Sequence, residues 1–496
     1  MWRITHNNSS IPIGDIPCFP IDIARAEIIA QINRGMRPVF FFGNKENNAV
    51  RAYIVLADDD RSQIMVSSVD LGMPGQEYPS LTADVPQMSM FEREIYEDFG
   101  VIPAGHPWLK PVRFSYNRFN PLMSMGKYPF FTVEGESIHE VAVGPVHAGI
   151  IEPGHFRFMC HAEDIFHLEI QLGYQHRGIE QLFVLRHGKP KIHLAESIAG
   201  DTVIGHSLAY AQVVESCADV SVSRRADSIR AVALEMERIA VHIGDLAALS
   251  GDVAYLLGNA VFGAIRTQVI NTTLALCGSR FGRGLIREGG VVYDIAADMR
   301  DSIIRVLNDV EERVVLMAEK MFSTPSVLAR FEQAGVVDKE TARLIGLVGM
   351  AARASGIPRD VRTTHPSGAY RFYPMHTIVM ESGDVFARGY LRYAEIRQSI
   401  EFIRDLLKNF PSDEPVREPA DIMKKDRFSV SMVEGWRGEL SHCGMTDSRG
   451  ELVRYKIKDP SFHNWFGLAV AVRNNGISDF PLCNKSFNLS YCGHDL

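Results

Sequence analysis

The sequence predicts an α+β protein with a small α+β N-terminal domain and a larger, mainly α domain that carries a minor antiparallel sheet. Segments rich in β-branched and aromatic residues crowd the first 70 positions, as expected of strands. The middle of the chain has long stretches with apolar residues at steps of three and four, which indicate amphipathic helices. Beyond Pro411 the pattern changes to that of strands and loops.

The composition is that of a globular protein with a substantial core. The chain has 496 residues, of which 46% are hydrophobic and 23% charged. Its net charge of -8 argues against nucleic acid as the main partner, because phosphate binding needs a basic face. The 7 cysteines are scattered and form no C-x-x-C pair, which favours reduced thiols over disulfides. We therefore do not expect a zinc or iron–sulfur site held by this chain alone.

Two further expectations concern the membrane. The N-terminus lacks a charged region followed by an apolar stretch, so we expect no signal peptide. The sequence also lacks a run of about 18 apolar residues, so we expect no direct membrane span. A membrane role would then depend on partner chains.

The first 125 residues are assigned to the small domain. Residues 24–32 have helical spacing, and residues 38–42, 50–56 and 62–69 are typical of strands. Three consecutive aspartates at 58–60 are interpreted as a solvated turn between two strands rather than a metal site. Alternating acids and bases in residues 91–99 predict a charged surface helix, with Gly100 as its C-cap.

A linker and the larger domain follow. Residues 117–134 are rich in Asn, Pro, Ser, Met and Gly, and we place the domains at 1–125 and 136–496 with a linker at 126–135. Helices are predicted over residues 229–247 and 296–322 and after a cap at Asp384. Residues 350–370 read as a basic loop. The Gly- and Arg-rich loop at 279–290 lacks G-x-G-x-x-G spacing, so NADH is not expected as a direct substrate.

Polar side chains gather in two places. Residues 144–207 combine His, Glu and Arg with glycines, a density that is unusual for an ordinary core segment. In the helix at 229–247, Glu235, Arg238 and His242 form a polar line. This line is either a solvated face or a set of partners for residues 144–207, and Glu235 and Arg238 could also pair with each other.

Six motifs follow one another along the chain: Gly144-Pro-x-His147, Gly173-Tyr174-x-His176-Arg177-Gly-x-Glu180, Glu235-x-Glu237-Arg238-Ile-x-x-His242, Gly289-Gly290-Val291, Asp360-Val-Arg362 and Val433-Glu-Gly-Trp-Arg-Gly-Glu439. In this order they resemble the large subunit of membrane-bound, group 4 [NiFe] hydrogenases of formate hydrogenlyase type. They resemble the related quinone-site large subunit of complex I almost as well. Glu92-Arg-Glu94 with Gly105-His-Pro107 resembles the small complex I subunit beside it, a docking module without a cofactor.

The family's nickel–iron site uses two C-x-x-C pairs, and this sequence departs from both. The first pair falls on Ala199 and Thr202. In the best alignment of the second pair, Leu489 and Cys492 stand at the cysteine positions, which leaves one thiol. Alanine cannot ligate a metal and threonine is a poor ligand for a soft metal, so the nickel–iron site is disfavoured.

The complex I resemblance also supplies only part of a quinone site. His147 matches the family histidine, but the family tyrosine falls on Gly200. Tyr174, Tyr210 or Tyr491 could take its place, and the sequence leaves these alternatives open. The cofactor-binding positions implied by the resemblance are His147, Tyr174, His176, Arg177 and Arg362.

The resemblance implies a redox or coupling subunit, cytoplasmic and peripheral on the inner face of the cell membrane. Its expected partners are a small subunit with a [4Fe–4S] cluster and membrane subunits that move ions. Glu152, His147, Asp201 and His206 are expected to handle protons, since a buried glutamate near histidines can titrate near neutrality. The alternatives are a structural or conformational-coupling subunit, in which the polar network only fixes the fold, and a genuine [NiFe] hydrogenase.

Overall fold

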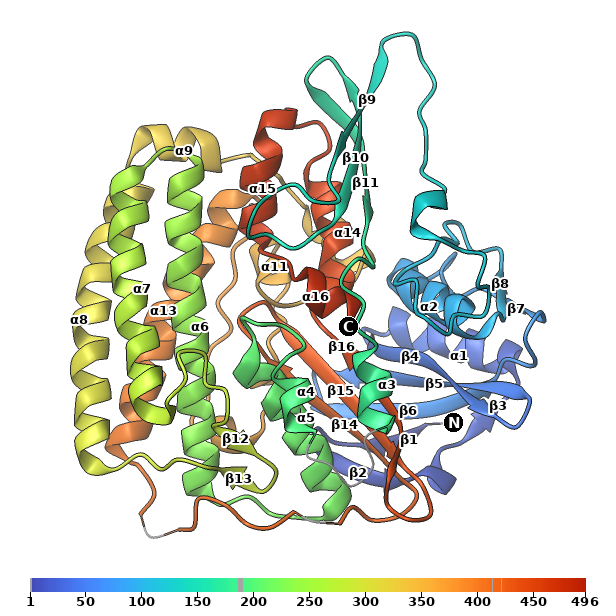
Figure 1. Ribbon diagram of the computed structural model, residues 1–496, viewed down its shortest axis with the longest axis horizontal. Coiled ribbons are helices and arrows are strands. Elements are labelled where there is room, and N and C mark those ends of the chain that lie inside the picture. Colours follow the sequence, from blue (N-terminus) through green and yellow to red (C-terminus); the bar gives the residue numbers. More distant parts are fainter. Residues whose placement is uncertain (1, 186–190, 413, 421) are drawn as a thin grey trace.

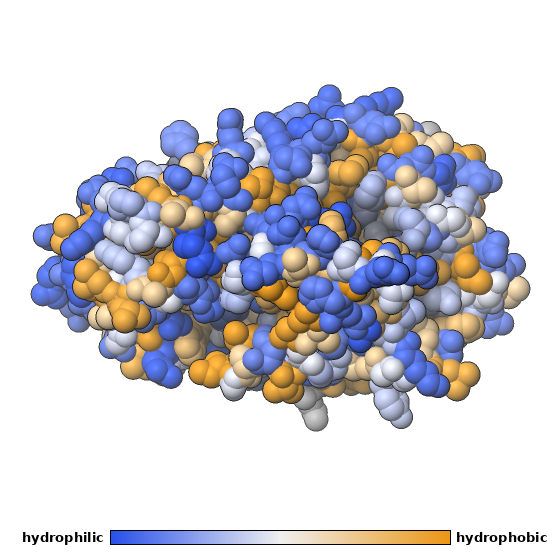
Figure 2. Space-filling model, turned by 90° about the horizontal axis from the view of Figure 1, so that it is seen from above, coloured by the Kyte–Doolittle hydropathy of each residue, from blue (hydrophilic) through white to orange (hydrophobic). Residues whose placement is uncertain are grey.

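The computed structural model describes residues 2–185, 191–412, 414–420 and 422–496. A bundle of long helices forms one side and a sheet-rich N-terminal part the other, with a second sheet between them (Figure 1). Helices and mostly antiparallel sheets occur together, so the α+β prediction is confirmed. The face seen from above mixes hydrophilic side chains with small groups of hydrophobic ones (Figure 2).

The N-terminal part is built on a five-stranded sheet in the order β1-β6-β5-β4, with β3 parallel to β6. Hydrophobic side chains of β4 and β5 are buried on both faces of the sheet, which explains their near-continuous apolar runs. The helix and the three strands expected here are confirmed. The elements are β1 (Arg3–Thr5), β3 (Cys18–Phe19), α1 (Ile21–Asn33), β4 (Arg37–Glu46), β5 (Ala49–Asp58), β6 (Gln63–Asp70), β7 (Glu77–Pro79), α2 (Ser89–Phe99) and β8 (Ile102–Ala104).

Helix α2 ends as expected but lies in a different environment. Gly100 caps it with a left-handed φ of 71°. The expectation of a surface helix is wrong, because Glu92, Glu94 and Glu97 are all buried. The carboxylate of Glu92, for example, accepts hydrogen bonds from the Thr82 hydroxyl at 2.6 Å and the Leu81 N–H at 2.9 Å. These acids hold the loops that flank α2 rather than facing water.

Four long helices form the bundle at the left of Figure 1: α6 (Arg224–Asp252), α7 (Leu256–Cys277), α8 (Ala297–Phe322) and α13 (Val385–Lys408). Asp384 caps α13 by accepting a hydrogen bond from the Ala387 N–H at 2.9 Å, as predicted. Helix α7 is the one described helix that is long and apolar enough for a membrane span, and it packs in the bundle against α6 and α8.

The sheet between the two parts has the order β16-β15-β14-β2, formed by β16 (Leu452–Lys458), β15 (Glu439–Thr446), β14 (Arg427–Glu434) and β2 (Ser9–Pro12). An N-terminal strand therefore completes a sheet made from the last 70 residues. The expectation of strands beyond Pro411 is confirmed, but three helices that follow were missed: α14 (Ser461–Ala471), α15 (Phe480–Phe487) and α16 (Tyr491–Asp495). Helix α14 is buried on nearly every face, which removes the amphipathic period.

Residues 350–370 also differ from the expected loop. They contain the short helices α11 (Gly349–Ala354) and α12 (Val361–Thr364), and their arginines Arg353 and Arg362 are buried. Residues 144–207, which combine His, Glu and Arg with glycines, contribute to the sheet β11-β10-β9 and continue into three helices. The remaining elements are β9 (Ile138–Val143), β10 (His155–His161), β11 (Asp164–Gln171), α3 (Ile179–Leu185), α4 (Ile192–Ala195), α5 (Val203–Ala218), β12 (Ile286–Arg287), β13 (Gly290–Val291), α9 (Pro325–Phe331) and α10 (Lys339–Leu344).

Candidate functional site

The loop between β9 and β10 folds onto the C-terminal helix α16. Its Glu152 carboxylate accepts a hydrogen bond from the Cys492 N–H at 3.0 Å. His147 Nε2 lies 3.4 Å from the Tyr491 hydroxyl oxygen. Of the three tyrosines that the sequence left open, Tyr491 is therefore the one that reaches His147.

Glycines allow this close approach. A Cβ atom on Gly154 would lie 2.6 Å from the Tyr491 ring, and one on Gly144 would lie 2.2 Å from the Gly154 carbonyl oxygen. Gly144 also has a φ of +100°, which a residue with a side chain rarely adopts. The loop can carry His147 and Glu152 to α16 because these two positions lack side chains.

Burial sets the protonation of this site. Burial lowers the pKa of His147, so its imidazole is neutral at physiological pH. Burial also raises the pKa of Tyr491 to about 12 and that of the Cys492 thiol to about 11. Both groups therefore keep their protons near neutrality, and Cys492 is a thiol rather than a thiolate.

Arg177 joins the two segments in which the family places its cysteines. The guanidinium donates hydrogen bonds to the carbonyl oxygens of Ser197 at 2.6 Å and Ile198 at 2.8 Å, and it reaches that of Cys492 at 3.4 Å. Ala199 follows directly on Ile198, so the segment with Ala199 and the segment with Cys492 meet in the structure.

Tyr174 and His176 are organised by the end of α16. Asp495 accepts hydrogen bonds from the backbone N–H groups on either side of Tyr174, at 2.8 Å each. The His176 ring lies 2.8 Å from the Asp495 carbonyl oxygen, while the Tyr174 hydroxyl donates to Gln171 at 3.3 Å. The backbone beside Tyr174 and the His176 ring thus hold the loop on α16, and no hydrogen bond among the described residues joins either side chain to His147.

Asp201 pairs with Arg437 from the hairpin between β14 and β15. The guanidinium contacts both carboxylate oxygens, at 2.6 and 2.9 Å, and reaches the Thr202 hydroxyl at 3.2 Å. Burial alone would raise the pKa of Asp201, but the Arg437 charge brings it below its usual value. Asp201 is therefore ionised and fixed in an ion pair.

His206 lies in a separate, fully buried row. Its Nε2 is 3.3 Å from Asp459, its Nδ1 is 3.0 Å from His442 Nε2, and His442 Nδ1 is 2.8 Å from the Tyr455 hydroxyl. Asp459 lies against α16, since a Cβ atom on Gly493 would lie 2.7 Å from the Asp459 carboxyl carbon. No local sequence pattern pointed to His442, Tyr455 or Asp459, because sheet register and helix packing bring them together.

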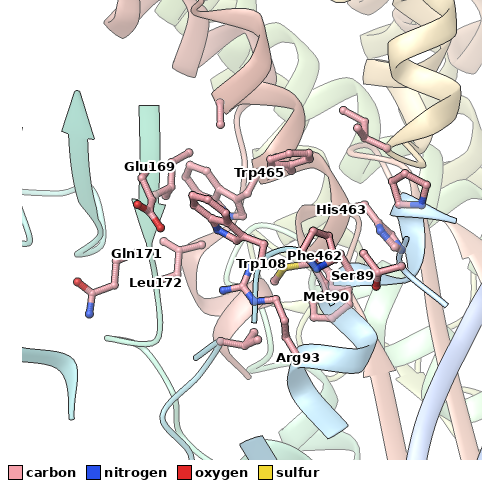
Figure 3. Close-up of a pocket in the computed structure, with 18 of the residues that line it drawn as sticks. Ser89, Met90, Arg93, Trp108, Glu169, Gln171, Leu172, Phe462, His463 and Trp465 are labelled. Carbon is pink, nitrogen blue, oxygen red and sulfur yellow. Dashed lines mark hydrogen bonds between the residues drawn. The ribbon is translucent and has the colours of Figure 1, made fainter. Parts of the chain in front are cut away.

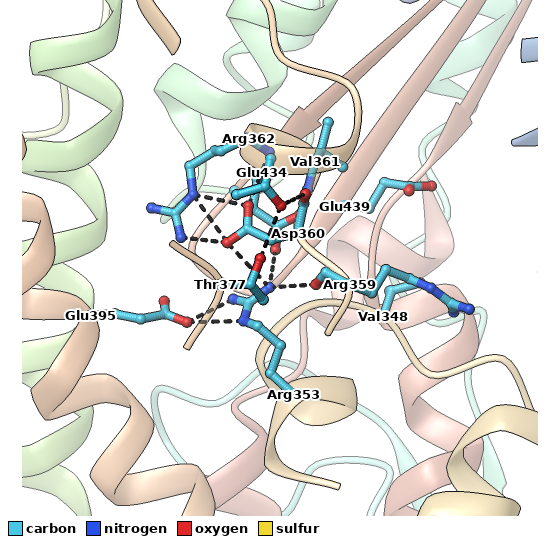
Figure 4. Close-up of polar contacts among 12 residues, drawn as sticks. Val348, Arg353, Arg359, Asp360, Val361, Arg362, Thr377, Glu395, Glu434 and Glu439 are labelled. Atoms are coloured by element: carbon cyan, nitrogen blue, oxygen red, sulfur yellow. Dashed lines mark hydrogen bonds and ion pairs between the residues drawn. The ribbon is translucent and has the colours of Figure 1, made fainter. Parts of the chain in front are cut away.

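Arg362 belongs to a third group, inside the large domain. It contacts the Asp360 carboxylate at 2.6 Å (Figure 4). It also contacts Glu235 of α6 at 3.2 Å. Glu235 also pairs with Arg238 at 3.0 Å, as the sequence suggested. The polar line on α6 is neither a solvated face nor a set of partners for residues 144–207. It is fully buried against α12, α13 and β14.

Glu434 belongs to the same network and has a raised pKa. Burial and the neighbouring Asp360 charge raise the pKa of Glu434 to about 7, while Arg353, at 2.7 Å, opposes that shift. Figure 4 shows Arg353 between Glu395 on one side and Asp360 and Glu434 on the other. The network ties α6, α13, β14 and the segment of α11 and α12 to one another.

The donor set at the meeting of the two segments does not fit a nickel–iron centre. Ala199, Thr202 and Leu489 supply no thiolate, which leaves Cys492 as the one sulfur ligand among the four positions. Within the described residues no group of three or more His, Cys, Asp and Glu side chains is arranged to hold a metal ion. The four-thiolate chemistry of the family therefore has no counterpart in these residues.

Family models match two parts of the chain. The model of the respiratory-chain NADH dehydrogenase 49 kDa subunit matches residues 258–495, and that of the 30 kDa subunit matches residues 35–125. A solved chain from the membrane-bound sulfane sulfur reductase, an archaeal respiratory membrane complex, shares the fold. The match has a TM-score of 0.68 at 23% sequence identity and covers 73% of this chain and 99% of the solved chain.

Curated relatives cover most of the sequence. Formate hydrogenlyase subunit 5 of Escherichia coli K12 is 30% identical over 475 residues, which are 91% of this chain and 83% of that protein. Hydrogenase-4 component G of the same organism is 29% identical over 92% of this chain and 83% of its own. Membrane-bound hydrogenase subunit alpha of Pyrococcus furiosus is 28% identical over 70% of this chain and 85% of that protein. The chain therefore belongs to the family of complex I-related hydrogenase large subunits, with 30 kDa-type and 49 kDa-type parts fused, and is a subunit of a complex-I-like energy-converting complex.

Proposed function

We propose that this chain is a redox or coupling subunit that works without a nickel–iron centre. The observation that carries the proposal is the donor set where the two motif segments meet. Arg177 holds them together, yet only Cys492 offers sulfur there. The names of the relatives, which are hydrogenase, formate hydrogenlyase and NADH-quinone oxidoreductase subunits, support redox chemistry in the complex as a whole.

In this proposal electrons arrive from a [4Fe–4S] cluster in a small partner subunit, and membrane partners couple the transfer to ion movement. The loop that carries His147 presents apolar side chains outward, with Val146 80% and Ile150 98% exposed. Exposed hydrophobic side chains of this kind favour contact with another protein chain. We therefore propose this loop as a contact with the small subunit, with the complex on the cytoplasmic face of the membrane.

The residues around α16 are proposed to bind and move protons. Tyr491 keeps its proton, and the neutral His147 imidazole lies within reach of its hydroxyl. Glu152 is anchored by the Cys492 N–H at the same helix end. The electron acceptor that suits the Tyr491 hydroxyl and His147 Nε2 is a quinone headgroup, whose carbonyl oxygens accept hydrogen bonds.

Elemental analysis of the intact purified complex is the first test. We expect iron from the partner's cluster and no nickel in proportion to this chain. Stoichiometric nickel would contradict the proposal, because it would require ligands other than the residues at Ala199, Thr202, Leu489 and Cys492.

Glu152→Gln tests the proton-handling part. The amide oxygen can still accept the Cys492 N–H bond but cannot take up a proton. We expect the turnover of the complex to fall at least tenfold, within the roughly 10²–10⁴-fold range of general acid–base catalysis. Glu163→Gln, on the exposed turn between β10 and β11, is the matched control. Full activity of Glu152→Gln would end this assignment.

A second candidate function is conformational coupling without redox chemistry. The closed ion network of Figure 4 favours it, because its arginines and carboxylates bind one another rather than a ligand. Tyr491→Phe separates the two candidates. Loss of re-oxidation of the partner's reduced cluster, followed by electron paramagnetic resonance, supports electron transfer at this site, whereas an unchanged rate supports coupling alone.

A further inference from the structure

A cavity of about 600 Å³ lies between the N-terminal part and the large domain. Its walls come from α2 and the following loop on one side and from β11 and α14 on the other. Figure 3 shows Trp108 and Trp465 between Glu169 and Leu172 of one wall and Met90 and Arg93 of the other. The lining excludes His147, Glu152 and Tyr491, so this is a second site.

Flat aromatic rings dominate the lining. Five of them come from three separate segments of the chain: Trp108, Tyr128, Phe462, Trp465 and Phe466. The volume falls in the range of about 300–1,000 Å³ that is typical of small-molecule sites. Rings of this kind stack on flat, conjugated ligands and add binding energy beyond simple burial of surface.

The charged groups of the lining are mainly positive. Arg93 is fixed by donating hydrogen bonds to the carbonyl oxygens of Lys110 and Pro111, at 2.8 Å each. Arg473, the second residue after the end of α14, is exposed, and no described carboxylate forms an ion pair with it. The one acidic group of the lining, Glu169, is already neutralised by Lys110 at 2.6 Å. Two arginines therefore remain uncompensated at the cavity.

The cavity also touches the candidate site through a shared wall. Trp465 packs edge-on against Tyr491, with ring centroids 4.8 Å apart, and its indole N–H donates to the Ser490 carbonyl at 3.2 Å. A molecule that displaced Trp465 would thus disturb the start of α16, which carries Tyr491 and Cys492.

We propose that this cavity binds a flat aromatic ligand with one anionic group, with its ring between Trp108 and Trp465 and its charge at Arg473. The site is distinct from the electron-transfer site proposed above and does not depend on it.

Calorimetric titration of the full-length chain with 2-naphthoate tests the proposal. The neutral 2-naphthamide and the acyl chain dodecanoate serve as comparison ligands. We expect naphthoate to bind, and Arg473→Gln to weaken its binding about twofold to fivefold, as expected for one exposed charge contact. Ala83→Trp, at an exposed lining position, should abolish binding by filling the cavity.

Arg283→Gln is the matched control, since Arg283 is exposed on a loop that does not line the cavity. Thermal unfolding of each variant without ligand confirms that it is folded. Absence of naphthoate binding to the wild-type chain overturns the proposal, as does binding that Ala83→Trp leaves intact. Equal or tighter binding of naphthamide overturns the anionic requirement, and tighter binding of dodecanoate overturns the aromatic one.

Discussion

Glu395 on α13 shows how single residues carry this fold. It is buried, and its carboxylate contacts Arg353 at 2.7 Å, His242 at 2.9 Å and Arg238 at 3.5 Å. Burial alone would raise its pKa, but the surrounding positive charges bring that pKa well below its ordinary value. Such a group stabilises the fold only while its partners are present.

Glu395→Gln is expected to lower the free energy of unfolding by about 3–5 kcal/mol, because the buried Arg353 and Arg238 would both lose a carboxylate partner in the core. The measurement is urea unfolding followed by tryptophan fluorescence. Glu401→Gln, on the exposed face of the same helix, is the control and should change stability by less than about 0.5 kcal/mol. Equal effects of the two substitutions would contradict the role given to Glu395.

Glu237 on α6 is a buried glutamate whose pKa is raised, in contrast to the lowered pKa of Glu395. Its carboxylate accepts hydrogen bonds from the Ile204 N–H at 2.7 Å and the Gly205 N–H at 3.2 Å. Burial, with a contribution from the nearby Asp201 charge, nevertheless raises the pKa of Glu237 from 4.5 to about 8. The folded chain therefore binds more protons than the unfolded chain between these two pH values.

The free energy of unfolding should fall as pH rises from 4.5 to 8. Its change with pH is proportional to the number of protons bound in the unfolded state minus the number bound in the folded state, and this difference is negative here. We expect Glu237→Gln, which does not titrate, to remove up to about 1.4 kcal/mol of decline per pH unit between pH 4.5 and 8. Urea midpoints measured across this range check it. Glu312→Gln on the exposed face of α8 should keep the wild-type profile.

At the scale of elements, caps and glycines determine where helices stop and start. The buried Asp384 accepts hydrogen bonds from the Ala387 N–H, the Ser382 hydroxyl and the Gln333 N–H, at 2.7 to 3.0 Å. It thus starts α13 and also holds the loop after α9. Asp338 starts the short helix α10 in the same way but is exposed.

Asp384→Ala is expected to cost about 2 kcal/mol or more, at the upper end of N-cap effects, because three donors lose a buried acceptor. Asp338→Ala should cost about 1 kcal/mol or less, since water can replace its carboxylate. Differential scanning calorimetry of both variants decides the matter. A larger effect at Asp338 would show that burial does not control the strength of these caps.

At the scale of the whole molecule, the N-terminal segment is built into the large domain. Asn7 is buried, donates hydrogen bonds to the His365 and Met432 carbonyl oxygens at 2.9 Å each, and accepts one from the Met432 N–H at 2.8 Å. Beside it, β2 pairs with β14. Arg37 of β4 adds an ion pair to Glu439 of β15 at 2.5 Å.

Asn7→Ala is therefore expected to destabilise the whole chain by about 2–4 kcal/mol, because backbone groups of His365 and Met432 would be left buried without partners. The unfolding temperature should fall, and the fluorescence of tryptophans in both parts should change in a single transition. Asn271→Ala, on the exposed face of α7, is the control. Two separated transitions in Asn7→Ala would show that the parts are held together elsewhere.

Local sequence features determined much of this protein. The apolar period predicted α1, α6 and α8, Gly100 and Asp384 predicted two helix ends, and motif order predicted the fused fold. The loss of cysteines at Ala199 and Thr202 was equally visible. These features are readable because periodicity, capping and ligand chemistry act within a few residues of the chain.

Only the tertiary structure decided which groups meet. It selected Tyr491 as the partner of His147, 344 positions away, and placed His206 in a row with His442 and Asp459. It buried the polar line of α6, and it enclosed a cavity between two parts of the chain. These outcomes depend on contacts between distant segments, where burial turns a surface pattern into an ion network, and a local pattern contains no information about such contacts.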